Sequence, residues 1–211
     1  MHILGVWDGH DAGAALLIDG RLVAAVNEER LTRRKLEIHF PSRAIAACLD
    51  IARLSPDAVD VVAMSTTDVA KTISRVWPST KESYYQVRRR KVEPGALARL
   101  TRLAKYRITE WGPTSISAAI SRRACLGDLR ASGIGRATLR LYDHHACHAA
   151  AAAHASGFDS AVVITLDGVG DGRSASVSRF RDGRLEISIR STLAPAGNEK
   201  QVAAKDGPTM S

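Results

Sequence analysis

The sequence predicts a mixed α/β protein in which one three-stranded antiparallel unit occurs twice. Each unit consists of three strand-like apolar runs separated by Asp-Gly turns. The runs are residues 2–7, 13–18 and 21–26 in the first unit, and 160–166, 175–180 and 185–189 in the second. A separation of about 160 residues indicates a duplicated supersecondary unit rather than a short solenoid repeat.

The second turn of each unit carries the strongest hairpin signal. Asp19-Gly20 and Asp182-Gly183 each lie between two apolar runs. A type I′ turn needs a positive φ at both central residues, and Asp-Gly meets this need. Both sites are therefore predicted to be tight hairpins.

Helical and extended segments separate the two units. Their composition predicts a helix over 42–53, a strand over 59–65, an irregular helical region over 70–110, a helix over 115–126, a strand over 138–142 and an Ala-rich helix over 144–156. Pro41 and Ser42 begin the first of these helices, and Pro78 and Pro94 interrupt the irregular region.

Two such units with helices between them resemble the two lobes of the actin-like ATPases, whose fold is ribonuclease H-like. In those proteins glycine turns from both lobes approach phosphate oxygens, because glycine has no Cβ to obstruct them. Two unrelated β-meanders would produce the same pattern.

On this interpretation the first lobe is 1–158, with a basic helical insertion near 70–110, and 159–193 begin a second lobe. Residues 194–211 have no apolar periodicity and are expected to be disordered. The second lobe would remain incomplete, so we expect a fragment, a frameshifted product or one part of a split enzyme.

The composition of the chain argues against several classes of protein. The chain has 211 residues, of which 45% are hydrophobic, which is typical of a globular domain. No apolar run approaches the roughly 20 residues needed to cross a bilayer. The start of the chain has no basic region typical of a secretory signal, and three widely spaced cysteines do not suggest a disulfide framework. We therefore expect a cytoplasmic protein without a membrane partner.

The net charge of +8 is concentrated in one segment. Between Lys71 and Arg107 there are 11 Lys or Arg against Glu82 and Glu93. Such a charge run is typical of a solvated helical face, and an anionic partner such as a nucleotide or RNA is the alternative. No recognised nucleic-acid motif frames the segment, so a nucleic-acid partner is not expected.

The sharpest chemical signal is a pair of histidines at helical spacing. His144 and His148 lie four residues apart, so on a helix both point to one face and can bind one metal. Asp167 follows the next predicted strand and could add a carboxylate. Two histidines and one carboxylate favour Fe(II), with Mn or Zn as alternatives. His145 points to another face, where it could orient a ligand or contact phosphate, and Cys147 is interpreted as a packing residue.

The glycine turns are candidate phosphate sites. Gly9 and Asp11 in the first turn, and Gly168 and Gly170 in the second, are expected to contact a nucleotide cofactor. His10 could neutralise developing charge as a catalytic residue, or it could simply close the turn through backbone hydrogen bonds.

A charged run follows the first hairpin. Residues 28–35 include Arg30, expected to bind the cofactor, and Lys35, expected to act in catalysis. The run is either a cationic clamp for phosphate or a solvated strand end with ion pairs.

Five blocks of sequence resemble the opening of the O-carbamoyltransferases, the nodulation-factor and antibiotic-tailoring enzymes. The blocks begin at His10, Asp19, Glu28, Asp143 and Val163, and Phe40-Pro41 also matches. The resemblance covers about residues 1–190 in the right order, and the basic middle segment is its least distinctive part. Gly13 departs from the pattern, because the family commonly has Ser there.

The resemblance implies an actin-like fold and an ATP-dependent reaction. Members activate carbamoyl phosphate as carbamoyl adenylate and pass the carbamoyl group to a hydroxyl of a small-molecule acceptor. Their metal histidines match His144 and His148, and their first metal carboxylate matches Asp167. A later metal aspartate and the second half of the nucleotide site have no counterpart here, which implies a complementing C-terminal chain as partner.

Two alternative functions stay open at this stage. One is a catalytically inactive nucleotide- or metal-binding module. The other is a relative of the enzymes that make threonylcarbamoyl-modified tRNA, for which the basic segment 71–107 is the only independent support.

Overall fold

The computed structural model describes residues 1–88 and 112–191. Its first unit lies in a five-stranded sheet of order β3-β2-β1-β4-β5. The strands are β1 (His2–Trp7), β2 (Gly13–Ile18), β3 (Arg21–Asn27), β4 (Val61–Ser65) and β5 (Thr138–Tyr142). Only β2 runs antiparallel to the rest of this sheet. This is the strand order of the ribonuclease H-like lobes of actin-like ATPases, so the predicted fold class is confirmed.

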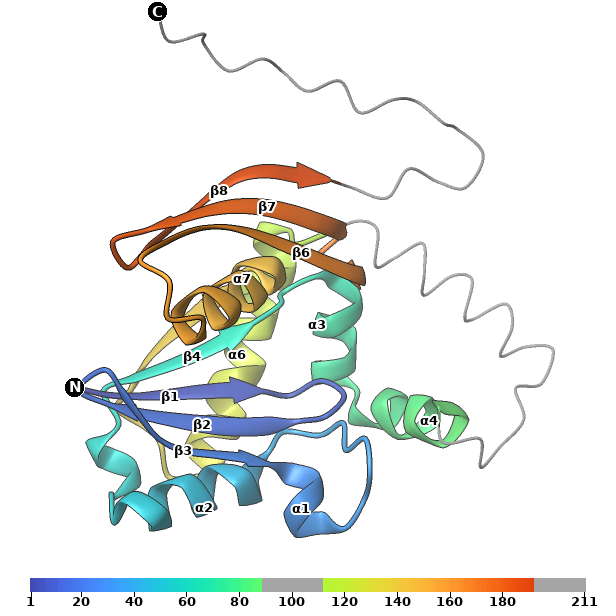
Figure 1. Cartoon of the computed structure of the whole chain (residues 1–211). Coiled ribbons are helices and arrows are strands. Elements are labelled where there is room, and N and C mark those ends of the chain that lie inside the picture. The colour runs from blue at the N-terminus through green and yellow to red at the C-terminus, as the bar shows by residue number, and fades with distance from the viewer. Residues whose placement is uncertain (89–111, 192–211) are drawn as a thin grey trace, which may run out of the picture.

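The second unit forms a separate antiparallel sheet, which lies above the first in Figure 1. It consists of β6 (Ser160–Gly170), β7 (Arg173–Arg181) and β8 (Arg184–Ser191). Both predicted hairpin turns have the required conformation: φ is 50° and 79° at Asp19 and Gly20, and 48° and 71° at Asp182 and Gly183. The predicted duplication is thus present as two three-stranded units.

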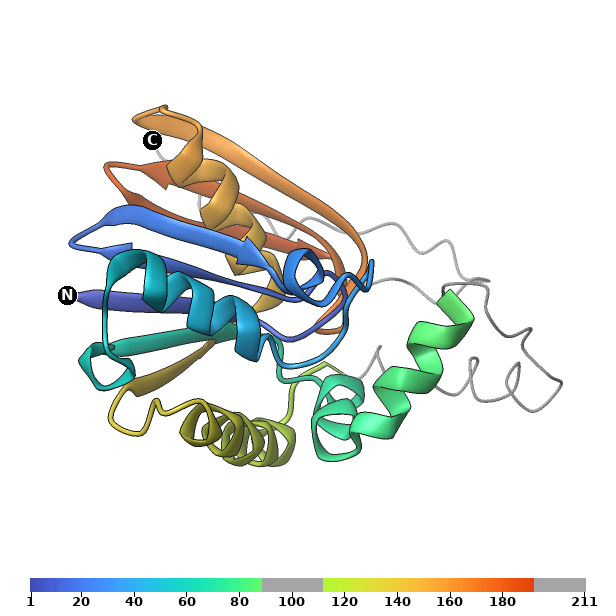
Figure 2. The same ribbon diagram turned by 90° about the horizontal axis from the view of Figure 1, so that it is seen from below.

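The described helices connect the sheets and cover their faces. They are α1 (Glu28–Thr32), α2 (Ser42–Ala52), the short 3₁₀ helix η1 (Pro56–Ala58), α3 (Val69–Val76), α4 (Pro78–Arg88), α6 (Ser115–Ala131) and α7 (His144–Ala155). The sequence did not indicate α1 or η1, and α6 runs five residues beyond its predicted end at 126. In both views α4 projects away from the sheets (Figures 1 and 2).

The predicted end of the strand at 166 is wrong. β6 continues to Gly170, and its pairing with β7 shifts register between Leu166 and Gly170. The turn itself is at Asp171 and Gly172, where φ is 52° and 75°. A β-bulge allows a strand to absorb extra residues and continue, so Asp167 lies within a strand and not in a glycine turn.

One apolar core holds the five-stranded sheet and its covering helices together. Leu4, Leu16 and Val62 of the sheet are fully buried. Ile45 of α2 and Leu129 of α6 join the same cluster. The helix α2 lies along β2 and β3 (Figure 2). The core therefore fixes the relative positions of β1, β2 and β4.

A smaller cluster attaches α7 to the second sheet. Ala149 and Ala153 of α7 are buried against Val163 of β6 and Phe180 of β7. Small side chains let the helix lie close to the strands, which explains the Ala-rich composition. In Figure 1, α7 lies between the two sheets, so its first turn can contact both.

Some predictions lie outside the described residues. These are the part of the basic insertion at 89–111 and the disordered tail expected at 194–211. Within the described ranges, none of the helices is long and apolar enough to cross a membrane.

The turn geometry yields a prediction with a matched control. An added Cβ at Gly20 or at Gly127 of α6 would have no neighbour within 4 Å, but Gly20 has φ of 79°. We expect Gly20→Ala to lower the free energy of unfolding by about 1–2 kcal/mol, because left-handed backbone is unfavourable for residues with a Cβ. We expect Gly127→Ala to raise it by up to about 1 kcal/mol through helix propensity. Urea unfolding measures both, and equal effects would contradict the turn assignment.

Candidate metal and phosphate site

The candidate site lies at the edge of the first sheet where its parallel strands end. β1, β4 and β5 are parallel, so the residues that follow them meet at one edge. Asp8 follows β1, Thr66 follows β4 and His144 follows β5. The β6–β7 turn reaches the same edge, because the backbone N–H of His144 donates to Asp171 Oδ2 at 2.8 Å.

The structure brings His144, His148 and Asp167 together. His144 Nε2 lies 2.8 Å from Asp167 Oδ2 and 3.1 Å from His148 Nε2. His148 Nε2 lies 4.0 Å from the same carboxylate oxygen. The three ligand atoms fall within 4.8 Å of one another, and His148 and Asp167 are exposed. We call these three residues the metal cluster.

The donor set fits a divalent ion. Ligand atoms bound at about 2.0–2.2 Å to one ion are separated by roughly 3 Å, which is close to the observed spacing. Burial, and then the charge of His144, lower the pKa of His148, so this imidazole is available in its neutral form. Neutral imidazole and ionised carboxylate are the forms that bind metal.

Neighbouring groups hold His144 in place. Its Nδ1 is 3.2 Å from Thr66 Oγ1, so a proton on Nδ1 leaves Nε2 free as a ligand. The Trp7 ring lies 5.7 Å from the His144 ring between centroids. Burial raises the pKa of Asp171, the acceptor for the His144 N–H, to about 6. Both sheets therefore set the position of one candidate ligand.

His145 does not contact a phosphate site. It is fully buried, and its Nδ1 lies 2.8 Å from Thr165 Oγ1 while Nε2 lies 3.1 Å from the carbonyl oxygen of Arg173. The carbonyl can only accept, so Nε2 carries the proton and Nδ1 accepts from Thr165. His145 thus links α7 to β6 and β7, and the phosphate alternative for this residue is wrong.

Cys147 is a packing residue, as interpreted from the sequence. Burial raises its pKa to about 11, so at neutral pH the group is a thiol and not a metal-binding thiolate.

The first turn is shaped by Trp7. A Cβ on Gly9 would lie 2.1 Å from Trp7 Cζ2, so glycine is needed there to admit the indole ring. Trp7 Nε1 also donates to the carbonyl of His10 at 2.7 Å. His10 Nδ1 lies 3.1 Å from Asp11 Oδ2, and His10 is exposed. The described geometry explains Gly9 through packing, and nucleotide contact by Gly9 and Asp11 remains a prediction.

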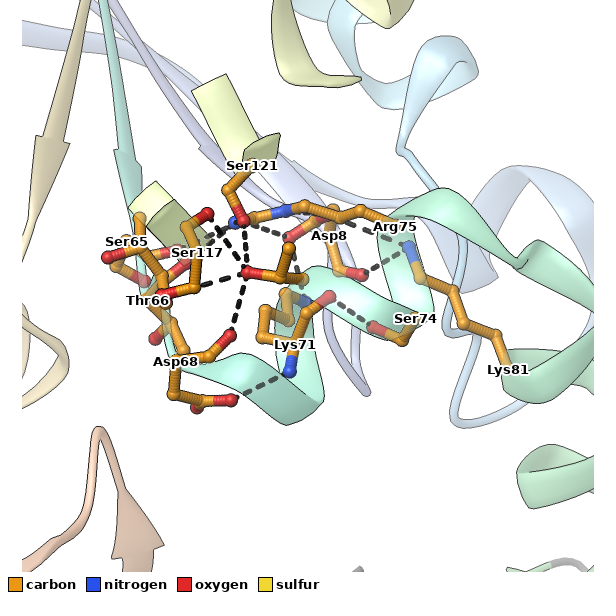
Figure 3. Close-up of polar contacts among 12 residues, drawn as sticks. Asp8, Ser65, Thr66, Asp68, Lys71, Ser74, Arg75, Lys81, Ser117 and Ser121 are labelled. Atoms are coloured by element: carbon orange, nitrogen blue, oxygen red, sulfur yellow. Dashed lines mark hydrogen bonds and ion pairs between the residues drawn. The ribbon is translucent and has the colours of Figure 1, made fainter. Parts of the chain in front are cut away.

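Asp8 lies at the centre of a buried cluster of cations. It is 1% exposed, and its carboxylate oxygens lie 2.8 Å from Lys71 Nζ, 2.9 Å from Arg75 Nε and 3.6 Å from Lys81 Nζ. Figure 3 shows Arg75 of α3 and Lys81 of α4 directed toward Asp8. Burial alone would raise the pKa of Asp8, but Lys71, Arg75 and Lys81 hold it well below its usual range. We call these four residues the Asp8 cluster.

The charged run after β3 divides into structural and exposed residues. Glu28 is buried and accepts from the backbone N–H of Arg43 and of Ala44, so it caps α2. Arg30 and Lys35 are exposed and line a hollow of about 240 Å³ together with Glu29 and Arg33. This hollow is positively charged, which suits an anion, but it is open to solvent.

The second glycine pair is not placed as expected. Gly168 and Gly170 belong to β6, so the structure does not present them in a turn. Their proposed contact with a nucleotide stays a prediction, and the reason given for it, a glycine turn at 167–172, is wrong except at Asp171 and Gly172.

Sequence reasoning missed Trp7, Thr66 and Lys71 as site residues. Trp7 contacts the His144 ring, and Lys71 Nζ lies 4.5 Å from the centroid of the Trp7 ring. Thr66 has φ of 67°, which is unusual for a β-branched residue and directs the chain toward His144. The basic composition of 71–107 pointed to Lys71 only as one member of a charge run.

Comparisons with known proteins agree with the family resemblance. Residues 2–194 match the family described as the carbamoyltransferase N-terminus. The uncharacterized protein sll1178 of Synechocystis is 33% identical over 83% of this chain and 27% of its own length. Nodulation protein NolNO of Sinorhizobium fredii is 29% identical over 88% of this chain and 22% of its own length. Among solved structures, YeaZ from Pseudomonas aeruginosa has a TM-score of 0.46 and 13% identity, covering 98% of this chain and 71% of that chain.

The fold and the site together define a ribonuclease H-like α/β protein with a His-His-Asp cluster beside its first turn. More specifically, the chain belongs to the carbamoyltransferase family and corresponds to its N-terminal domain. It spans between 22% and 27% of the length of the curated relatives named above.

The Asp8 cluster leads to a stability prediction. Asp8→Asn leaves three buried cations without a carboxylate, and loss of one partner of a buried ion pair costs about 3–5 kcal/mol. Because the folded pKa of Asp8 is lowered, its contribution is present above pH 4 or so and is lost as the pH falls below that value. Urea unfolding at pH 7 and in acid should therefore show a large loss at pH 7 that shrinks in acid. Asp19→Asn in the exposed turn is the matched control, and an equal effect of both changes would contradict a stabilising role for the buried Asp8 carboxylate.

Proposed function

We propose that this chain forms the metal-bearing lobe of an ATP-dependent O-carbamoyltransferase. The observation that supports this most strongly is the convergence of His144, His148 and Asp167 in a chain of this family. ATP and carbamoyl phosphate would be co-substrates, and the acceptor would be a hydroxyl group on a small molecule.

In the proposed reaction, water first cleaves carbamoyl phosphate to carbamate and phosphate. A carbamate oxygen then attacks the α-phosphorus of ATP, which forms carbamoyl adenylate and expels pyrophosphate. The acceptor hydroxyl then attacks the carbonyl carbon of the adenylate, and AMP leaves. An activated intermediate divides one difficult step into two easier ones.

The residues of this chain would contribute binding and orientation. His144, His148 and Asp167 would hold Fe(II), with Mn or Zn as alternatives, and the ion would supply Lewis acidity toward a phosphate oxygen. Thr66 and Asp171 orient His144 from the two sheets. Keeping the ligand side chains positioned before the substrate arrives avoids reorganisation during the reaction.

The charged turn residues would meet the substrates' negative charge. Arg30 and Lys35 face the open hollow, where a phosphate group could bind between them. His10, exposed beside the first turn, would donate a hydrogen bond to charge that develops in the transition state.

The second sheet supports a complementing C-terminal chain as partner. β6 is the counterpart of β1, which pairs with β2 on one side and β4 on the other. Within the described residues β6 pairs only with β7, and its Val162, Ile164 and Leu166 are 72%, 63% and 81% exposed. An apolar stripe beside an unpaired edge suits a further strand and its covering helices.

Metal binding is the first test. We expect the chain to bind one divalent ion, measured by calorimetry with Zn(II), Mn(II) and, without oxygen, Fe(II). His148→Ala should weaken binding by more than about tenfold, because one ligand of the set is lost. Affinity should also fall as the pH is lowered, because protons compete for the imidazoles.

The control for this test is His154→Ala, which removes another histidine from the same helix. His154 contacts Phe180 and lies outside the metal cluster. Equal binding by the wild type and by His148→Ala would count against the proposed metal site.

Activity is the second test. The chain alone is expected to show no measurable release of pyrophosphate from ATP and carbamoyl phosphate, because isolated phosphate contacts in water are weak. Joining it to the part of NolNO beyond the matched region should restore release, and His148→Ala should abolish the restored activity. NolNO divided at the same position is the positive control. An active control with an inactive chimera would favour a metal-binding module without catalysis.

A further inference from the structure

The Asp8 cluster contains more positive than negative charge. Lys71, Arg75 and Lys81 surround one carboxylate, and all three are at least nine-tenths buried in their side chains. Taking charges out of water is costly unless each has a partner. A buried excess of two positive charges therefore needs an explanation beyond the ion pairs with Asp8.

Arg75 is fully explained by its structural contacts. Its guanidinium donates to both Asp8 oxygens, to the carbonyl oxygens of Ser65 and Thr66, and to Ser121 Oγ (Figure 3). These bonds use all of its N–H directions and connect the ends of β1 and β4 with α3 and α6. Arg75 has no donor left for a ligand.

The two lysines have donors that the described residues do not use. Lys71 Nζ has one oxygen partner, Asp8 Oδ1 at 2.8 Å, and the face of the Trp7 ring. Lys81 Nζ reaches the Asp8 carbonyl at 3.4 Å and the carboxylate at 3.6 Å, which are long contacts. An ammonium group carries three N–H donors. Each lysine can therefore donate further hydrogen bonds.

Two other acids lie nearby without neutralising the lysines. Asp68 Oδ1 accepts from the backbone N–H of Lys71 and caps α3. Burial raises the pKa of Asp128 of α6, and the charge of Lys81 acts in the opposite direction. Neither carboxylate forms an ion pair within 4.0 Å of a lysine among residues 1–88 and 112–191. Burial, opposed by Asp8, lowers the pKa of Lys71 to about 8, as expected for an under-compensated cation.

We propose that Lys71 and Lys81 form an anion subsite for a dianionic phosphate group. The excess charge of the Asp8 cluster is +2, which matches a phosphate monoester above its second pKa of about 6. Trp7 contacts both Lys71 and His144, so one indole ring connects the subsite to the metal cluster. The subsite goes beyond the proposed function because it requires neither a metal nor carbamoyl chemistry, and it is separate from the hollow at Arg30 and Lys35.

The test compares thermal unfolding in inorganic phosphate with unfolding in sodium chloride of equal ionic strength, both with a chelator present. A ligand that binds the folded state raises the unfolding midpoint as its concentration increases. We expect phosphate to raise the midpoint of the wild type, and Lys81→Met to weaken phosphate binding at least about tenfold. Lys71→Met should do the same.

The variants also separate a binding role from a structural one. Removing one lysine relieves repulsion within the cluster, so Lys81→Met without phosphate should unfold at the wild-type midpoint or above it. Arg75→Met should unfold well below it, because its buried hydrogen bonds are lost. Arg123→Met on the exposed face of α6 should change neither the midpoint nor the phosphate response.

Carbamoyl phosphate and AMP each carry a phosphate dianion. Repeating the unfolding measurement with each compound shows which of the two supplies the phosphate group that binds. Stabilisation by either that Lys81→Met abolishes supports the subsite, and the tighter ligand identifies the substrate that uses it. A phosphate effect no larger than that of chloride would overturn the proposal. So would an undiminished phosphate response in Lys81→Met and Lys71→Met. Neither result depends on metal binding, so the proposed carbamoyltransferase function is tested separately.

Discussion

The buried contact between Asp8 and Arg75 determines the geometry of the whole site edge. Asp8 follows β1, and Arg75 of α3 also donates to the carbonyl oxygens of Ser65, which ends β4, and of Thr66 beside it. A buried carboxylate is tolerable only when it is paired and hydrogen-bonded. This requirement holds the first turn, the end of β4 and the last turn of α3 at one place. Figure 3 shows Asp8, Ser65, Thr66 and Arg75 of these segments close to one another.

Trp7 connects the Asp8 cluster to the metal cluster through its contacts with Lys71 and His144. Its ring needs the space left by Gly9, lies against Lys71 and contacts His144. Contacts with Thr66 on one side and with Asp171 on the other hold His144 in position. The metal cluster is therefore assembled where the two sheets approach each other, and a shift of either sheet would separate its members.

His145 plays the complementary structural role on the other face of the same helix. Its two ring nitrogens contact β6 and β7, whereas His144 faces β4. Adjacent residues on a helix point about 100° apart, so one pair of histidines serves two purposes. The first is available for a ligand, and the second keeps α7 attached to the strand that carries Asp167.

The local features of this protein were determined by the sequence itself. Asp19-Gly20 and Asp182-Gly183 form the turns that their φ preferences require, and His144 and His148 share a helix face through spacing alone. Family membership followed from blocks of residues in order. These features depend on residues that are close together in the chain or on patterns that the chain carries directly.

Only the tertiary structure decided which distant groups meet. The bulge that carries β6 through Asp167 depends on pairing with β7, and no local signal at 167–172 distinguishes it from a glycine turn. The meeting of Asp8 with Lys71, Arg75 and Lys81 depends on how α3 and α4 pack against the end of β1. In the sequence these three cations are part of a charge run typical of a solvated face. These cations can be buried because they pair with a carboxylate more than 60 residues away in the chain. Local propensity depends on neighbouring residues only, so it does not encode such a pairing.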